Sequence, residues 1–193
     1  MSFLGMWCLV PMRADAITEY APELVPAIEA EAALPRSTAL LRWWRTEGST
    51  EATRHDFVEA AAPSVLDEQI CRVYDAWERG RDDALPHFAV ATRNSYPAAA
   101  LAFALGPERF AGLPGWFGDL ILTPEQVRIT LPAVERVFTW TAASRPQARE
   151  LLMAALRDEG DPTDINALLE GVPPVWRAAA EAGRGLLGAH FIP

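Results

Sequence analysis

The clearest pattern of apolar and polar positions runs from Ser64 to Arg79. Apolar residues recur there every three or four positions, and charged residues fill the opposite side of the implied helix. Gly80 follows where a terminating glycine is expected, and Ser64 with Asp67 has the spacing of a capping box. The pattern predicts an amphipathic helix that packs on a core. Its apolar stripe consists of Leu66, Ile70, Val73, Tyr74 and Trp77.

Other helices are predicted from the same spacing and from residues that begin or end helices. Thr123 and Gln126 match a capping box around a first-turn proline, and Pro132 should kink or split the helix that follows. Pro22 and Pro26 should divide the helical segment that begins near residue 14. The predicted helices cover residues 14–20, 27–34, 36–47, 97–105, 124–138, 146–157, 163–169 and 173–182.

Three apolar runs have the length and composition of strands: Phe3–Val10, Asp119–Leu122 and Gly185–Ile192. They lie at the start, the middle and the end of the chain, with helices between them. This order indicates an α+β fold and not a repeating βαβ pattern. The chain of 193 residues contains no repeat or long linker. We therefore expect one α+β domain over residues 1–193, with a small mixed or antiparallel sheet covered by several helices.

The composition excludes several classes of function. All seventeen basic residues are arginine, so no lysine is present for a Schiff base, a pyridoxal phosphate anchor or a P-loop. A GC-rich genome explains the missing lysine without any functional pressure. The net charge of −9 argues against general binding of nucleic acid, which requires a basic face. Half of the residues are apolar, so a proper core is expected and disorder is not.

Cysteine usage and the N-terminal residues favour a cytoplasmic protein. Cys8 and Cys71 are more typical of reduced thiols than of a disulfide framework. The apolar run at the N-terminus has no positive charge before it, unlike a secretory signal, and no segment is long and apolar enough for a membrane span. No cluster of His and Cys has the spacing of a zinc site. We expect no metal and no cofactor.

Three segments in order resemble a known family: the opening MSFLGMWCLVP, the central LILTPEQVRITLPAVERVF and the closing VWRAAAEAGRGLLGAHF. Together they are similar to the YfbM-like family of small bacterial α+β proteins. Members of that family open with a methionine-rich strand and have a Thr-Pro-Glu-x-Val helix start further along the chain. The resemblance covers about a third of the chain. It implies the fold and a role in binding a partner, and it assigns no catalytic residue.

The most unusual local feature is the run Arg42-Trp43-Trp44-Arg45 in a predicted helix. Adjacent helical residues point about 100° apart, so only one of the two tryptophans can face the core directly. The other would lie beside an arginine, in a combination common at binding hot spots and able to stack on an aromatic ligand. The alternative is a wide buried face that the arginine stems cover. Trp116, in a glycine-rich loop, is a further candidate for binding a ligand or partner.

A second candidate site is formed by His55, Asp56 and Glu59. His55 and Glu59 lie four residues apart on an expected helix, so an imidazole and a carboxylate share one face and could exchange a proton with a substrate. A surface ion-paired face has the same sequence pattern. These residues are therefore acid–base candidates only in combination with a pocket.

Two functions remain open at this stage. The first is a non-enzymatic cytoplasmic binding protein, of an immunity or regulatory type, that meets a protein partner or a small aromatic ligand through the Trp/Arg patch. It predicts an exposed apolar surface near the tryptophans. The second is a cofactor-free enzyme or small-molecule binder of a bacterial secondary-metabolite pathway. It predicts an enclosed pocket where an aromatic wall meets a desolvated carboxylate or imidazole.

Overall fold

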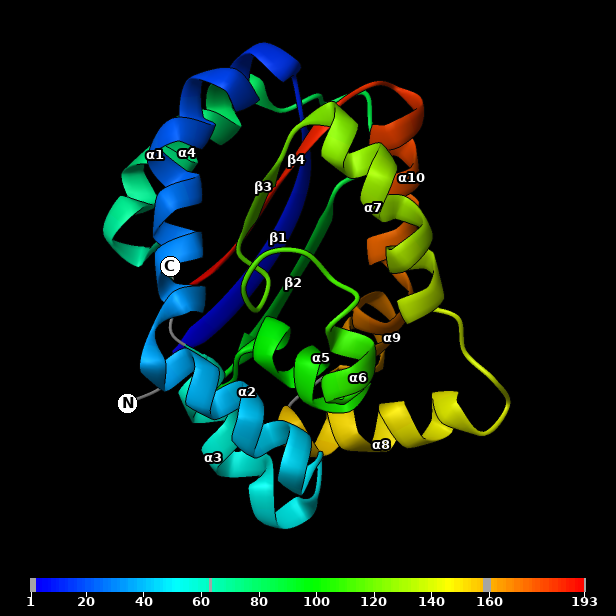
Figure 1. Cartoon of the computed structure of the whole chain (residues 1–193). Helices are drawn as coiled ribbons and strands as arrows, with labels where there is room; N and C mark the ends of the chain where they lie inside the picture. Colours follow the sequence, from blue (N-terminus) through cyan, green and yellow to red (C-terminus); the bar gives the residue numbers. More distant parts are fainter. Residues whose placement is uncertain (1–2, 63, 158–160, 193) are drawn as a thin grey trace.

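The computed structural model describes residues 3–62, 64–157 and 161–192. Helices and strands alternate irregularly along these residues, as in an α+β protein (Figure 1). The described elements in chain order are β1 (Leu4–Met12), α1 (Ala14–Ala33), α2 (Pro35–Glu47), α3 (Glu51–Ala61), the 3-10 helix η1 (Asp67–Gln69), α4 (Ile70–Gly80), β2 (Phe88–Arg93), α5 (Pro97–Leu105), α6 (Pro107–Phe110), β3 (Leu120–Leu122), α7 (Pro124–Val137), α8 (Ser144–Ala155), α9 (Pro162–Glu170), α10 (Val172–Glu181) and β4 (Gly185–Phe191).

The sheet has four antiparallel strands in the order β2-β1-β4-β3. The first and last strands of the chain are therefore neighbours at its centre, where Trp7 lies opposite His190 and Val10 opposite Leu187. This confirms the predicted α+β class and single domain and selects the antiparallel arrangement. The strand β2 was not predicted, because its sequence FAVATR continues into the apolar helix α5 after only three residues.

Helices cover the two faces of the sheet unequally. The helices α5, α7, α9 and α10 pack on the face that carries Trp7 and Leu9. Among the described helices, α1 and α4 pack on the opposite face, and in Figure 1 they lie together to the left of the strands. Along β1, side chains alternate between these two environments because successive residues of a strand point to opposite faces. The consequence is a sheet that is fully covered on one face and partly covered on the other.

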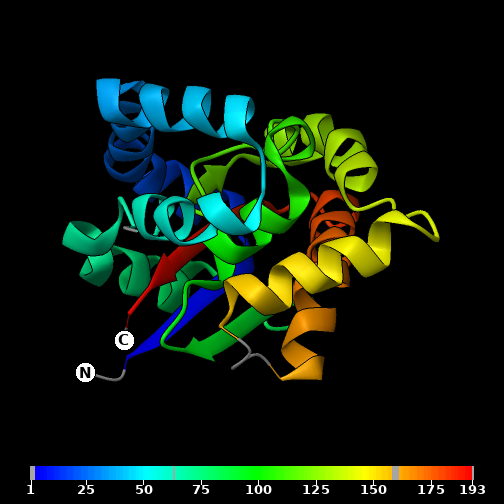
Figure 2. The same cartoon turned by 90° about the horizontal axis from the view of Figure 1, so that it is seen from below.

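A second body of packing lies beyond one end of the sheet, where α2, α3, α5 and α8 meet (Figure 2). All nine residues of α5 are buried, so this helix lies inside the others. The centre of this region is an aromatic cluster. Its members are Trp44, Phe57, Phe103, Phe110 and Phe117.

Pro22 and Pro26 do not divide the first helix as predicted, and Pro132, predicted to kink or split its helix, does not split it. The helix α1 runs unbroken through Pro22 and Pro26, and α7 runs through Pro132. All three prolines are exposed, so carbonyl groups that lose a helical partner face water. The buried residues on both sides of the α1 prolines lie on one face of a continuous helix, and this packing outweighs the lost hydrogen bonds.

The predicted helix over 64–79 begins six residues later than expected. The predicted capping box is not formed, because the Ser64 hydroxyl donates to Asp119 and accepts from the backbone of Leu66. By contrast, the box between Thr123 and Gln126 is present, with both reciprocal hydrogen bonds. None of the described helices is long and apolar enough to cross a bilayer.

Candidate functional site

Of the predicted Trp/Arg patch, the structure buries Trp44 and leaves Arg42, Trp43 and Arg45 at the surface of α2. Trp44 is completely buried and donates its indole N–H to Ser49 Oγ at 3.2 Å. Trp43 is half-buried, and Arg42 and Arg45 are exposed beside it on α2. The structure thus confirms that one tryptophan of the pair faces the core, and it removes Trp44 from the residues that a partner can touch.

The acid–base candidates on α3 do not form a pair. His55 and Asp56 are exposed, and Glu59 forms an ion pair with Arg157 at 2.8 Å instead of a contact with the imidazole. Trp116 is buried and lies in the wall of a cleft that Glu59 also lines. No group of three His, Cys, Asp or Glu side chains within the described residues could hold a metal ion.

A buried polar network connects three separate segments, and no spacing pattern in the sequence predicts it. Asp119, just before β3, accepts hydrogen bonds from the backbone N–H of His190 at 3.0 Å, from the Ser64 hydroxyl at 2.8 Å and from the N–H of Val65 at 2.9 Å. The His190 ring lies against the same carboxylate, with Nδ1 3.4 Å from Oδ1, and its Nε2 meets the carbonyl oxygen of Ala62. Both side chains are buried.

This network connects the sheet to the segment after α3. The Asp119 carboxylate extends the β3–β4 ladder by one bond and fixes the segment after α3 against the sheet. Ser64 lines the cleft beside Trp116, but its hydroxyl donates to the Asp119 carboxylate instead of to the imidazole, so these residues lack the arrangement that activates a nucleophile.

Burial lowers the pKa of His190, but the Asp119 carboxylate, the Ala62 carbonyl and the charge of Asp67 outweigh burial and raise the pKa above its ordinary value. The folded protein therefore binds this proton more tightly than the unfolded chain does. Stability from the pair is complete below about pH 6.5, the unfolded pKa of histidine, and is lost as the pH rises through the raised folded pKa.

We accordingly expect the free energy of unfolding to fall on the alkaline side of about pH 6.5, measured by urea unfolding at a series of pH values. The His190→Gln variant should be less stable and should lack this part of the pH dependence. A wild-type profile that the substitution leaves unchanged in shape would contradict the assignment.

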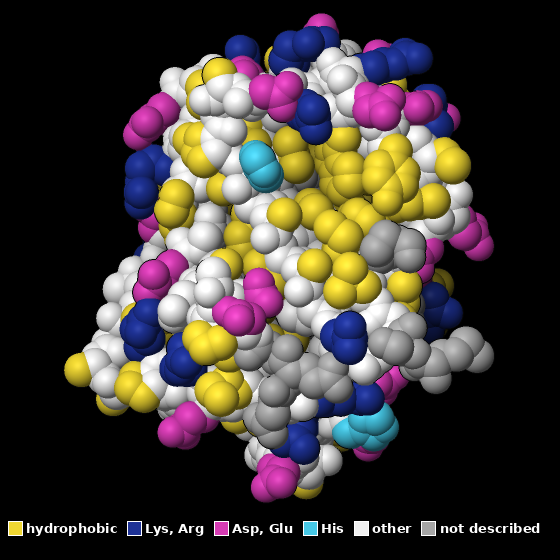
Figure 3. Space-filling model, turned by 180° about the vertical axis from the view of Figure 1, so that it is seen from behind, with side chains coloured by type: hydrophobic (Ala, Val, Ile, Leu, Met, Phe, Trp, Pro, Cys, Tyr) yellow, Lys and Arg dark blue, Asp and Glu magenta, His cyan; other side chains and the backbone are white. Residues whose placement is uncertain are grey.

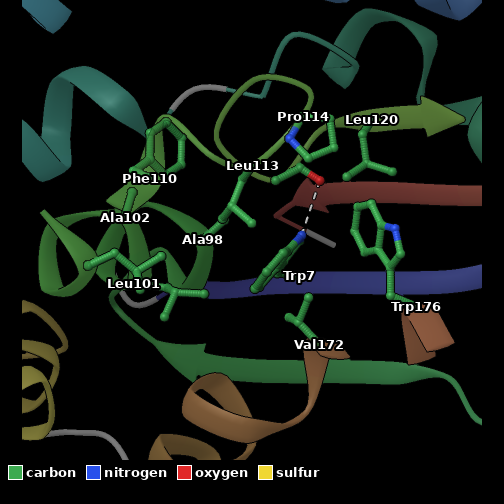
Figure 4. A pocket seen from close by; sticks show the side chains of 12 residues that line it. Trp7, Ala98, Leu101, Ala102, Phe110, Leu113, Pro114, Leu120, Val172 and Trp176 are labelled. Atoms are coloured by element: carbon green, nitrogen blue, oxygen red, sulfur yellow. Dashed lines mark hydrogen bonds between the residues drawn. The ribbon is translucent and has the colours of Figure 1, made fainter. Parts of the chain in front are cut away.

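The pocket shown in Figure 4 is an apolar seam between the sheet and its helices. Trp7 and Trp176 lie in its wall, and Trp7 donates its indole N–H to the carbonyl of Gly118 at 3.1 Å. The space amounts to about 20 Å³, enough for a single water molecule. No acidic, basic or histidine side chain lines it. The predicted meeting of an aromatic wall with a desolvated acid or base does not occur here.

The other face of the sheet presents a different kind of site, which we call the open face. Side chains of alternate residues on β1 and β2 point to this side, and α4 forms a wall along it. Figure 3 shows apolar side chains gathered in a hollow on this side of the molecule. The open face consists of Leu4, Met6, Cys8 and Val10 of β1, Ala89 and Ala91 of β2, and Tyr74 and Trp77 of α4.

Exposure on the open face is unusual for this chain. Leu4 and Tyr74 are 42% and 41% exposed, and both belong to the few large apolar side chains that the described surface leaves open. Tyr74 was predicted to be part of the buried stripe of its helix. Its ring instead packs edge-on against Trp77 and Phe191 at the border of the hollow, with one side toward solvent.

The thiol and imidazole at one end of the open face do not form a reactive pair. Cys8 and His87 line the same recess of about 120 Å³ with Asp82 and Asp83. Burial raises the pKa of the Cys8 thiol to about 11, so the thiol stays protonated at neutral pH and is a poor nucleophile. The recess therefore acts as an apolar floor with polar residues at its rim.

Comparison of the chain with protein-family models finds no match, and neither the curated proteins nor the solved structures include a significant relative. The resemblance to the YfbM-like family therefore stays a prediction.

Proposed function

We propose that this chain is a non-enzymatic interaction protein that docks an amphipathic helix of a protein partner on its open face. The observation that carries the proposal is the unequal covering of the sheet, which leaves an apolar floor beside α4 with Leu4 and Tyr74 exposed. Surfaces of this kind on a protein with an otherwise ordinary core mark interaction sites.

The shape of the open face favours a helix as the occupant. Its floor along β1, from Leu4 to Val10, spans about 20 Å, which equals about four turns of an α-helix. One side is already walled by α4, so a helix laid beside α4 would complete the layer that is missing over β2. Tyr74 and Trp77 supply the large aromatic contacts typical of such grooves.

Charge favours a partner with basic residues at the ends of its apolar stripe. Glu78 lies one turn beyond Tyr74 on the same side of α4, and at the recess end of the open face Asp83 forms an ion pair with Arg81. The whole chain carries a charge of −9, so a second copy of itself would be repelled where a basic helix would be attracted.

A reducing compartment forms part of the proposal. Both cysteines are free, and Cys71 is exposed on α4, one turn before Tyr74. An exposed thiol at an interaction surface is more compatible with the cytoplasm than with an oxidising environment.

The test uses a labelled synthetic helix of about five turns with a leucine stripe and arginines at both ends. We expect saturable binding in fluorescence anisotropy, and at least tenfold weaker binding to Tyr74→Glu. The matched control is Ile129→Glu on α7, where an apolar side chain that is 69% exposed lies away from the open face and its loss should leave binding unchanged. Circular dichroism establishes that both variants fold.

Two companion measurements decide between occupants. The same stripe with glutamates at its ends should bind at least tenfold more weakly, and a shuffled peptide of equal composition should not saturate. Equal binding of the shuffled peptide, or binding that survives Tyr74→Glu, contradicts the proposal. A concentration-dependent dimer in sedimentation that Tyr74→Glu dissociates would assign the open face to a second copy instead.

A further inference from the structure

The second unusual feature of the surface is an arginine stacked on a tryptophan, far from the open face in the fold. The guanidinium carbon of Arg109, on α6, lies 4.1 Å from the ring centroid of Trp140, in the loop after α7. The indole N–H of Trp140 donates to the carbonyl of Leu169 at 3.0 Å, which fixes the ring. An arginine–tryptophan pair was expected at residues 42–45, and the fold produces it here from residues 31 positions apart.

Backbone carbonyl groups fix the Arg109 side chain, but no described carboxylate balances its charge. Its Nη2 donates to the carbonyl oxygens of Val137 and of Thr139, the latter at 2.9 Å. Its Nε and Nη1 have no partner among the described residues, and no described carboxylate forms an ion pair with it. Burial lowers the pKa of this guanidinium, which reflects the cost of removing its charge from water. The result is a half-buried cation with free donors.

Both side chains line a pocket of about 300 Å³, within the range of small-molecule sites. Ser144 and Gln147, from the first turn of α8, and Ser49 add polar groups. Apolar groups line the remainder of the wall. They belong to Ala104, Leu105, Ala148 and Leu151.

The Arg109–Trp140 pocket is lined by an arginine and by no carboxylate. The chain has 26 acidic residues, and the clefts beside Trp116, Cys8 and Ile121 each include at least one of them. A free guanidinium in a pocket without carboxylates attracts anions, and fixing it on an aromatic ring lowers the entropy lost on binding.

We propose that the Arg109–Trp140 pocket binds a small organic anion, a carboxylate or a phosphate monoester, with an apolar body of a few carbon atoms. The anion would accept hydrogen bonds from Nε and Nη1 of Arg109, and its remaining oxygens would accept from Ser144 and Gln147, which line the same pocket. The apolar body would lie against Leu105 and Leu151. The site is independent of the open face, so either proposal can fail without the other.

The test measures binding of hexanoate, acetate and hexyl phosphate by calorimetry and by proton–nitrogen NMR of the Trp140 indole N–H. We expect hexanoate or hexyl phosphate to bind saturably, and acetate at least tenfold more weakly because it lacks the apolar body. The two saturating probes distinguish a carboxylate site from a phosphate site. Absence of saturable binding by both overturns the proposal.

Two variants connect binding to the pocket. Arg109→Gln should weaken binding at least tenfold, but it also removes the hydrogen bonds to residues 137 and 139. Gln147→Glu avoids this problem, because a glutamate in the first turn of α8 is compatible with the helix yet places a negative charge in the pocket. We expect the same loss there and no change in Arg128→Gln, an exposed arginine of α7. Binding that Gln147→Glu leaves intact would mean that Arg109 only ties the loop after α7.

Discussion

Asp119→Ala is expected to lower the free energy of unfolding by about 3–5 kcal/mol, because it leaves a buried imidazolium without its counter-charge. The carboxylate is completely buried and accepts hydrogen bonds from the Ser64 hydroxyl and from the backbones of Val65 and His190. Each of these donors would lose its partner where water cannot replace it. The measurement is urea unfolding followed by circular dichroism.

Asp119→Asn keeps the size of the side chain and removes its negative charge. Both oxygens of the carboxylate accept from donors: Oδ1 from the His190 N–H, and Oδ2 from Ser64 and Val65. An asparagine keeps one acceptor and must turn its NH₂ group toward a donor on the other side. We expect Asp119→Asn to recover little of the lost stability. Removal of an exposed acid, as in Asp83→Ala, is the control and should cost less than about 0.5 kcal/mol. Near wild-type stability of Asp119→Asn would contradict the role of the charge.

Features that depend on neighbours in sequence could be predicted. The Thr123–Gln126 capping box needs only a spacing of three residues and a following helix, and it forms as expected. Ser64 and Asp67 have the same spacing, but the Ser64 hydroxyl bonds to Asp119, 55 residues further along the chain. The Ser64–Asp67 capping box does not form because the Ser64 hydroxyl makes a long-range contact, which sequence spacing does not predict.

In the candidate sites too, features set by neighbours in sequence could be predicted and features set by tertiary contacts could not. The sequence predicted a Trp/Arg patch at residues 42–45 as one alternative, and helical geometry indicated that one of the two adjacent tryptophans would face the core. It could not indicate that Arg109 meets Trp140, because α6 and the loop after α7 are brought together by the fold. The open face could not be predicted either. In FAVATR the residues pointing to both sides are mostly apolar, so the alternation that marks a half-exposed strand is weak.

Trp44→Ala is expected to cost about 3–5 kcal/mol in the free energy of unfolding, the range for removing a large aromatic side chain from a core. The ring of Trp44 is fully buried and packs on Phe57 at 4.3 Å and on Phe110 at 5.5 Å between centroids. Its neighbour Trp43 is half-buried and provides a matched control, for which about 1 kcal/mol is expected. Unfolding is followed by circular dichroism, because both substitutions alter the tryptophan fluorescence.

The contrast between these two variants bears on how any binding data should be interpreted. A Trp44→Ala variant that no longer binds a partner would have lost the packing that connects α2 to α3 and α6, and it would not locate a binding site. Trp43→Ala, with Arg42 and Arg45 retained, tests the surface of α2 without disturbing the core. If Trp43→Ala instead costs as much stability as Trp44→Ala, the assignment of Trp44 as the tryptophan that faces the core is contradicted. Arg109 would then lose the argument that the aromatic cluster of Trp44, Phe110 and Phe117 holds α6 in place.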